Sequence, residues 1–204
     1  MPSSKIVLWE VDVQADFMLP GGKLYVPGAE KLLSNIRRLT DAARDGRAFL
    51  VSHGCYHAPD DPEFSQFPPH CVRGTQGAEF VPEALADKVL RVPNEPDFQL
   101  PASFAPYHQV LMEKKTLDIF DTCHAEEVLS RFRPEVEFAV FGVVTEICVL
   151  KSARGLLQRG RRVALVTDAI ATLRAEDGDR SVAELRQLGA RLTTTAQVLV
   201  LLEG

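Results

Sequence analysis

Apolar residues along the chain alternate between short continuous runs and stretches in which they recur at helical spacing. The continuous runs are typical of buried strands, and they lie at residues 6–13, 47–52, 109–113, 137–143 and 162–167. Residues 197–202 form a further apolar run that fits either a last strand or a helical turn. The helical spacing predicts helices over residues 29–44, 124–132, 146–159 and 179–188.

Strands that alternate with helices predict right-handed crossovers and a largely parallel sheet. We therefore expect an α/β fold of three layers, α/β/α, with a mainly parallel, six-stranded, doubly wound sheet in a single domain over residues 1–204. Residues 53–83 show no clean period and are rich in Pro, Gly, His and Phe. A loop of that length inside a compact domain is typical of a functional segment.

Composition narrows the classes of partner. The net charge is −5 and no basic patch or arm is present, which argues against nucleic acid. No apolar run approaches the length of a membrane span, and the apolar stretch near the start is too short for a signal peptide. The four cysteines, at positions 55, 71, 123 and 148, are irregularly spaced, which favours reduced thiols and a cytoplasmic protein.

Cys148 stands where a strand gives way to a helix. The strand over residues 137–143 ends at Gly142-Val-Val-Thr145, and the helix that follows begins near Glu146. The positive end of a helix dipole favours a thiolate over a thiol, and the free N–H groups of a first turn can hold an oxyanion. The segment fits a cysteine nucleophile, although a small buried hydrophobe is the commonest fate of a free cysteine.

An acid and an amine follow two other strands. Asp12 ends the first strand, and Lys114 follows the strand over residues 109–113. Each alone fits a turn residue or a solvated loop. Because the site of a parallel α/β sheet lies at the carboxyl ends of its strands, both residues are expected beside Cys148. Acid, amine and thiol together make a base, an electrostatic stabiliser and a nucleophile.

At this point the chain resembles a known family, the isochorismatase-like cysteine hydrolases, and within it most closely the nicotinamidases. The resemblance covers nearly the whole chain and rests on four motifs in the family's order. These motifs are Asp12-Val-Gln-Ala-Asp16-Phe17, Phe67-Pro-Pro-His70-Cys-Val-Arg-Gly74-Thr75, Lys114-Lys-Thr-Leu-Asp-Ile-Phe120 and Gly142-Val-Val-Thr145-Glu-Ile-Cys148-Val.

The resemblance implies a Cys-Asp-Lys triad. Cys148 would be the nucleophile, Asp12 the general base and Lys114 the catalytic lysine, six residues before Phe120 as in the family. It also implies a cis peptide bond at Val143–Val144, beside an oxyanion pocket. The implied reaction is amide hydrolysis through a thioester, with nicotinamide converted to nicotinate and ammonia.

The resemblance further implies a divalent metal site in the loop after the second strand. Its ligands would be His57, Glu63 and His70, with Cys55 at a position where the family has aspartate. Because a thiolate is a good ligand for zinc and a poor one for magnesium or manganese, zinc is the expected metal. Three alternatives stay open: three ligands with water, an empty site, or a structural zinc held by Cys55, His57, His70 and Cys71.

The resemblance places Phe17, Phe67 and Leu117 on the walls of the substrate pocket, with Leu117 where an aromatic residue is usual. It implies a small amide as the substrate and a homo-oligomer as the assembly. Other readings of the chain are a metal-independent hydrolase of a ureido or carbamoyl compound, a zinc-stabilised binding scaffold, and a redox-responsive thiol protein that uses Cys55, Cys71 or Cys123.

Overall fold

A parallel sheet of seven strands forms the centre of the computed structural model, which describes residues 5–203. The strand order is β3-β4-β2-β1-β5-β6-β7, and every pairing in it is parallel. The strands are β1 (Ile6–Val11), β2 (Phe49–Cys55), β3 (Val89–Val92), β4 (Gln109–Lys114), β5 (Glu137–Gly142), β6 (Arg162–Ile170) and β7 (Arg191–Thr193). Residues 1–4 and 204 of the expected single domain lie outside the described residues.

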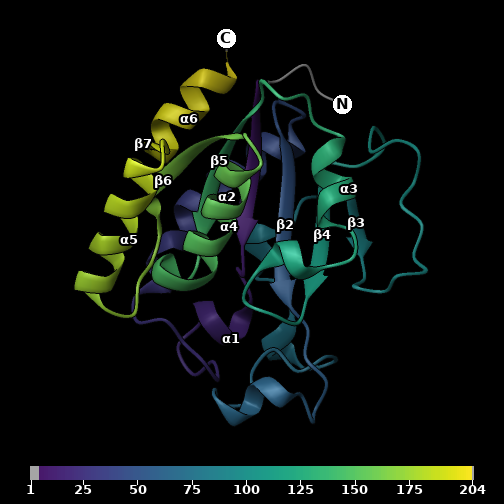
Figure 1. Ribbon diagram of the computed structural model, residues 1–204, viewed down its shortest axis with the longest axis vertical. Helices are drawn as coiled ribbons and strands as arrows, with labels where there is room; N and C mark the ends of the chain where they lie inside the picture. Colours follow the sequence, from purple (N-terminus) through teal and green to yellow (C-terminus); the bar gives the residue numbers. More distant parts are fainter. Residues whose placement is uncertain (1–4, 204) are drawn as a thin grey trace.

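Helices cover both faces of this sheet (Figure 1). They are α1 (Ala15–Met18), α2 (Leu33–Arg44), α3 (Ala125–Ser130), α4 (Leu150–Gln158), α5 (Ala175–Gln187) and α6 (Thr195–Leu202). Apolar residues of α2 and α6 share one buried cluster with alternate residues of the central strands. Residues of α3, α4 and α5 belong to a second cluster on the other face. The three-layer, doubly wound α/β fold expected from the sequence is confirmed.

The strand count differs from the expected six, because the two edge strands carry too little pattern to be recognised. β3 and β7 are four and three residues long, and most of their residues are exposed or half-buried. Residues 197–202 belong to α6, whose start is fixed by a reciprocal cap between Thr194 and Gln197. Helix α5 begins at Ala175, earlier than the predicted residue 179.

The carboxyl ends of the strands meet at one edge of the sheet, where the chain leaves β2 for the long loop shown in blue in Figure 1. There Cys55, the last residue of β2, pairs in register with Lys114, the last residue of β4. Gly142 ends β5 with a φ of +118°, and a side chain at this position would collide with the backbone of Val11. Only glycine therefore lets β5 run so close to the end of β1.

Among the described residues, no helix has both the length and the apolar character needed to cross a membrane.

Candidate active site

The structure brings Asp12, Lys114 and Cys148 together at this edge of the sheet. The Lys114 Nζ lies 3.0 Å from Asp12 Oδ2 and 3.8 Å from Cys148 Sγ. All three side chains are buried, and that of Lys114 has no exposed surface. Asp12 lies just beyond β1 in the left-handed region, with a φ of +52°, a conformation that aspartate tolerates better than most residues. The predicted proximity of acid, amine and thiol is therefore observed.

Asp12 and Lys114 form a buried ion pair. Burial alone would raise the pKa of Asp12, but the Lys114 ammonium and His53 lower it to about 2. Burial alone would lower the pKa of Lys114, but the Asp12 carboxylate and the neighbouring thiols raise it well above its usual value. The carboxylate is thus ionised and able to accept a proton, and the amine carries its charge.

Cys148 differs from the sequence-based expectation of a thiolate. Its burial, together with the nearby Asp12 carboxylate, raises the pKa of the thiol well above its usual value, and Lys114 offsets only part of this. The residue lies in a single π-helical turn, Thr145–Val149, that precedes α4. Turns of this kind are frequent at functional sites. The direction of this shift favours the neutral thiol, and a neutral thiol needs a base before it can act as a nucleophile.

The turn that carries Cys148 is tied to the segment after β6. The peptide bond Val143–Val144 is cis, as the resemblance implied. Thr145 donates hydrogen bonds from its N and Oγ1 to the Ala171 carbonyl, both at 2.8 Å. The Glu146 carboxylate accepts hydrogen bonds from Thr172 Oγ1 at 2.6 Å and from Leu173 N at 2.9 Å. These bonds fix the backbone around the thiol.

A second group of side chains, next to the triad, has the composition of a metal site. Ligand atoms of Cys55, His57 and His70 all lie within 4.8 Å of one another, and the three residues are buried. The His57 Nδ1 lies 3.1 Å from Asp61 Oδ2, and the His70 Nδ1 lies 2.8 Å from the Pro68 carbonyl. Partners of this kind on one ring nitrogen leave the other free to bind a metal.

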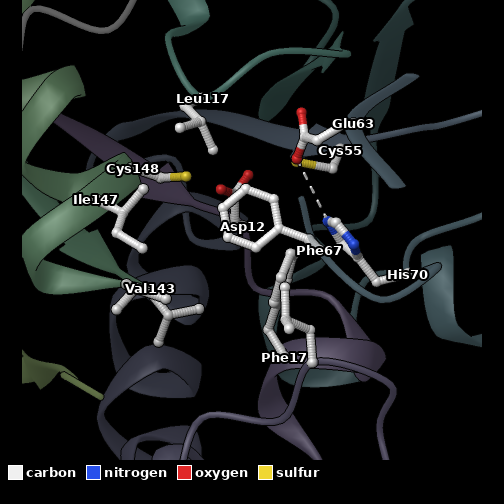
Figure 2. A pocket seen from close by; sticks show the side chains of 12 residues that line it. Asp12, Phe17, Cys55, Glu63, Phe67, His70, Leu117, Val143, Ile147 and Cys148 are labelled. Carbon is white, nitrogen blue, oxygen red and sulfur yellow. Dashed lines mark ion pairs between the residues drawn. The ribbon is translucent and has the colours of Figure 1, made fainter. Parts of the chain in front are cut away.

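Glu63 adds a carboxylate to this group. Its Oε1 lies 3.9 Å from His57 Nε2 and 3.8 Å from His70 Nε2, the latter drawn as a dashed line in Figure 2. The His57 Nε2 is buried and has no hydrogen-bond partner among residues 5–203. Two imidazoles, a thiol and a carboxylate at such spacing fit zinc or a similar divalent ion.

The two other cysteines near this site differ in their placement. The Cys55 Sγ lies 2.9 Å from Lys114 Nζ, so the candidate metal site and the triad share this contact. Burial raises the pKa of the Cys55 thiol to about 12, although Lys114 opposes the shift. Cys71 is not in the group; its Sγ lies 3.9 Å from the Gly77 carbonyl. The structural zinc that would use Cys71 is therefore not supported.

A pocket of about 370 Å³, including its opening to solvent, lies between the two groups. Phe17, Phe67 and Leu117, which the sequence placed on its walls, do line it (Figure 2). Leu24 and Ile147 also line it and were missed by the sequence analysis. The space inside the walls is narrow, with room for the centres of water-sized spheres over only about 30 Å³, which favours a small substrate.

Three buried side chains form a group that reaches Asp12 through His53, and the sequence analysis assigned no role in the site to any of them. The His53 Nδ1 lies 3.7 Å from Asp12 Oδ1, and its Nε2 lies 2.7 Å from Ser152 Oγ, which in turn accepts a hydrogen bond from Trp9. Burial lowers the pKa of His53, while Asp12 opposes the shift. Two features of the sequence could have indicated this group: His53 lies near the end of a strand, and Ser152 lies one helical turn beyond Cys148.

Comparisons with known proteins agree with this geometry. The family model described as the isochorismatase domain matches residues 7–92 and 85–197. A nicotinamidase of Escherichia coli (strain K12) is 24% identical, over 96% of this chain and 97% of its own length. A nicotinamidase/pyrazinamidase of Mycobacterium tuberculosis is 27% identical, over 91% and 97%.

A solved structure of a pyrazinamidase of Pyrococcus horikoshii in complex with zinc superposes with a TM-score of 0.72 at 27% identity. The superposition covers 93% of this chain and 99% of that one. Because the family model spans most of the sequence, the chain belongs to the isochorismatase family.

Proposed function

We propose that this protein is a cysteine amidohydrolase that converts nicotinamide to nicotinate and ammonia. The observation that carries the proposal is the placement of two groups at one apolar pocket. The thiol of Cys148, the Asp12 carboxylate and the Lys114 ammonium lie on one side, and the imidazole and thiol donors of Cys55, His57 and His70 lie near the other. The named activities of the relatives support the same assignment.

The first half of the reaction transfers the acyl group to sulfur. Asp12 takes the thiol proton as the Cys148 sulfur forms a bond to the amide carbonyl carbon, and the N–H groups of Val144 and Cys148 hold the resulting oxyanion. Asp12 then gives the proton to the nitrogen, the C–N bond breaks, and ammonia leaves. The product is a thioester on Cys148.

The second half returns the enzyme to its resting state. Asp12 takes a proton from a water molecule as the water oxygen adds to the thioester carbonyl carbon, and the C–S bond then breaks. The proton passes from Asp12 to the sulfur, and the carboxylic acid product leaves. Lys114 keeps Asp12 ionised between the steps, because their 3.0 Å contact opposes protonation of the carboxylate.

Cys55, His57, Glu63 and His70 would hold a divalent metal, most suitably zinc. Such a metal supplies a Lewis acid that can grip the ring nitrogen of a pyridine substrate. Phe17 and Phe67 would pack on the ring, since both line the pocket. The largely apolar walls favour this neutral substrate over a carbamoyl compound that carries its own carboxylate.

An assay of ammonia release tests the proposal. We expect release from nicotinamide and pyrazinamide, and little from biuret or ureido compounds. The Cys148→Ala variant should lose turnover while it retains the fold, and Cys123→Ala, which removes an exposed thiol, is the matched control. Release by the Cys148→Ala variant at the wild-type rate would end the nucleophile assignment.

The same panel tests the metal. Protein purified without chelator should contain about one zinc per chain, and prolonged chelation should raise KM for nicotinamide. Protein free of metal but fully active would support the metal-independent alternative, and metal without any amidase activity would support a zinc-stabilised scaffold. We also propose a cytoplasmic location and a homo-oligomer, the latter testable by light scattering.

A further inference from the structure

A chain of three buried side chains reaches the oxygen of Asp12 that Lys114 does not bind. Lys114 Nζ faces Oδ2 at 3.0 Å, whereas His53 Nδ1 faces Oδ1 at 3.7 Å. The other ring nitrogen of His53 lies 2.7 Å from Ser152 Oγ, and Trp9 Nε1 donates to the same hydroxyl at 3.2 Å. Each of these side chains is at most 1% exposed, so solvent does not compete for the contacts.

The hydrogen bonds determine which nitrogen of His53 carries the proton. Trp9 can only donate, so Ser152 Oγ is an acceptor in that bond. The hydroxyl has one proton of its own, and within residues 5–203 the only other partner in hydrogen-bonding distance is His53 Nε2. The arrangement that leaves no donor of this group unsatisfied has Ser152 donating to Nε2, which places the imidazole proton on Nδ1, toward Asp12.

Packing fixes the imidazole in this position. The Trp9 ring contacts the His53 ring edge-on at 5.9 Å and is itself packed against Phe138 at 5.6 Å and Phe120 at 6.2 Å. Ser152 belongs to α4, the helix that follows the Cys148 turn. The Cys148 turn and the helix that directly continues it thus hold both the nucleophile and, through His53, the partner of its base.

We propose that His53 is a positioning residue for Asp12, whose carboxylate it holds from one side through Nδ1–H while Lys114 holds it from the other. The inference rests on the proposed role of Asp12 as the general base. The contact at 3.7 Å is longer than a hydrogen bond, and contacts of this kind tighten when substrate fills a site. With both oxygens held, the carboxylate keeps one orientation toward the thiol.

The tautomer can be observed directly. In protein labelled with ¹⁵N-histidine, with the His53 signals assigned by their loss in a His53→Asn variant, we expect the proton on Nδ1. Ser152→Ala should lose this preference, and Ser152→Thr, which keeps the hydroxyl, should retain it. A proton found only on Nε2 in the wild-type protein would overturn the proposal, since Nδ1 would have nothing to donate. The measurement needs no substrate.

Two variants of similar size separate positioning from packing. His53→Asn keeps an amide nitrogen near the Nδ1 position, whereas His53→Leu removes every donor. We expect the Leu variant to lose about tenfold to a hundredfold in kcat, with KM nearly unchanged, because a small misplacement of a catalytic group has effects of this size. The Asn variant should retain most of kcat. Equal kcat in the two variants would contradict the proposal.

Alkylation of Cys148 by iodoacetamide makes the test independent of the amide substrate. The rate should be lower in the Leu variant than in the Asn variant, and an equal or higher rate would count against positioning. If the wild-type protein releases no ammonia from any amide, the proposed function fails while tautomer and alkylation still decide the role of His53. If the Leu variant does not fold, alkylation of Ser152→Ala against Ser152→Thr gives the same decision.

Discussion

Two buried carboxyl groups lie two residues apart at the carboxyl end of the first strand, and burial has opposite outcomes for their pKa values. Asp12, just past the end of β1, has a pKa lowered to about 2. Glu10, within β1, has a pKa raised to about 8 by burial, which its hydrogen bond with Ser52 opposes only in part. Both side chains are out of contact with water. Burial alone therefore does not decide whether a carboxyl group in this sheet is charged.

The difference lies in the neighbours. Asp12 faces the ammonium of Lys114, whereas Glu10 Oε2 accepts a hydrogen bond at 2.7 Å from Ser52, whose hydroxyl is in turn bound by the Gln109 amide. A cation restores the stability of a buried anion, and neutral hydrogen bonds restore only part of it. The edge of the sheet consequently stabilises a charged carboxylate, and the region around Glu10 a neutral carboxyl group.

Removal of the Lys114 ammonium should have the largest effect, because it removes the main difference between the surroundings of Asp12 and Glu10. A Lys114→Met variant loses the largest interaction that opposes the effect of burial on Asp12, and only His53 and Cys148 remain. The pKa of Asp12 therefore rises, and a carboxyl group that already holds a proton cannot accept the thiol proton. We expect kcat/KM to fall about a thousandfold, a loss typical of a disabled acid–base group. The neighbouring Lys115 is exposed, so Lys115→Met is the matched control and should stay close to wild type. A larger loss in the control would reverse the assignment of the lysine.

The Glu10→Gln variant tests the neutral state of Glu10 through the pH dependence of the free energy of unfolding. Between pH 5 and 8 unfolded Glu10 has lost its proton and folded Glu10 still holds it, so the unfolded state binds fewer protons and unfolding becomes easier as pH rises. The free energy of unfolding should fall by about 1.4 kcal/mol per pH unit from this group. Urea titrations at several pH values should show that the Glu10→Gln variant lacks this part of the dependence of the free energy of unfolding on pH.

Asp12→Asn is the contrasting control for that experiment. The stability that Asp12 contributes is present above its ordinary pKa and is lost only as pH falls toward about 2. Between pH 5 and 8 the Asp12 carboxyl group is therefore ionised in both the folded and the unfolded protein. The variant should therefore change the overall stability and keep the part of the pH dependence that Glu10 contributes in this range. A slope that disappears in Asp12→Asn and persists in Glu10→Gln would exchange the two assignments.

Ser52→Ala should give the smallest effect. The variant removes the hydrogen-bond donor to Glu10. The pKa of the folded carboxyl group therefore rises further above about 8, and the group stays neutral to a higher pH. The variant loses the hydrogen bonds from Ser52 to Glu10 and from Gln109 to Ser52, whereas Gln109 keeps its bond to the Ala84 carbonyl, so the free energy of unfolding should fall by about 1 kcal/mol at pH 7. Ser130→Ala, on the exposed surface of α3, should cost less and leave the titration unchanged.

Local sequence patterns were sufficient to predict those parts of the fold in which an element is long or a motif is contiguous. The buried runs of β1, β2, β4, β5 and β6 and the period of α2 predicted the layers, and the strand-end rule predicted that Asp12, Lys114 and Cys148 meet. The edge strands β3 and β7 were missed because four and three residues carry no periodicity that separates them from loops. Their pairing depends on neighbours distant in the chain.

The candidate site shows the same division. The residue types for a thiol, a base, a lysine and a set of metal ligands are legible in the sequence, because chemistry restricts which residues can serve. The neutral state of Cys148 and the part played by His53, Ser152 and Trp9 were not, because they depend on burial and on contacts between β1, β2 and α4.

The sequence by itself determined which chemical groups this protein has and at which strand ends they stand. Only the tertiary structure decided their charge and direction. The pKa of a carboxyl group on β1 depends on whether a lysine more than a hundred residues away reaches it, and electrostatic interactions depend on distance in space. Asp12 and Glu10 are both buried carboxyl groups, and the contact of Asp12 with Lys114 is the largest of the interactions that set their pKa values apart.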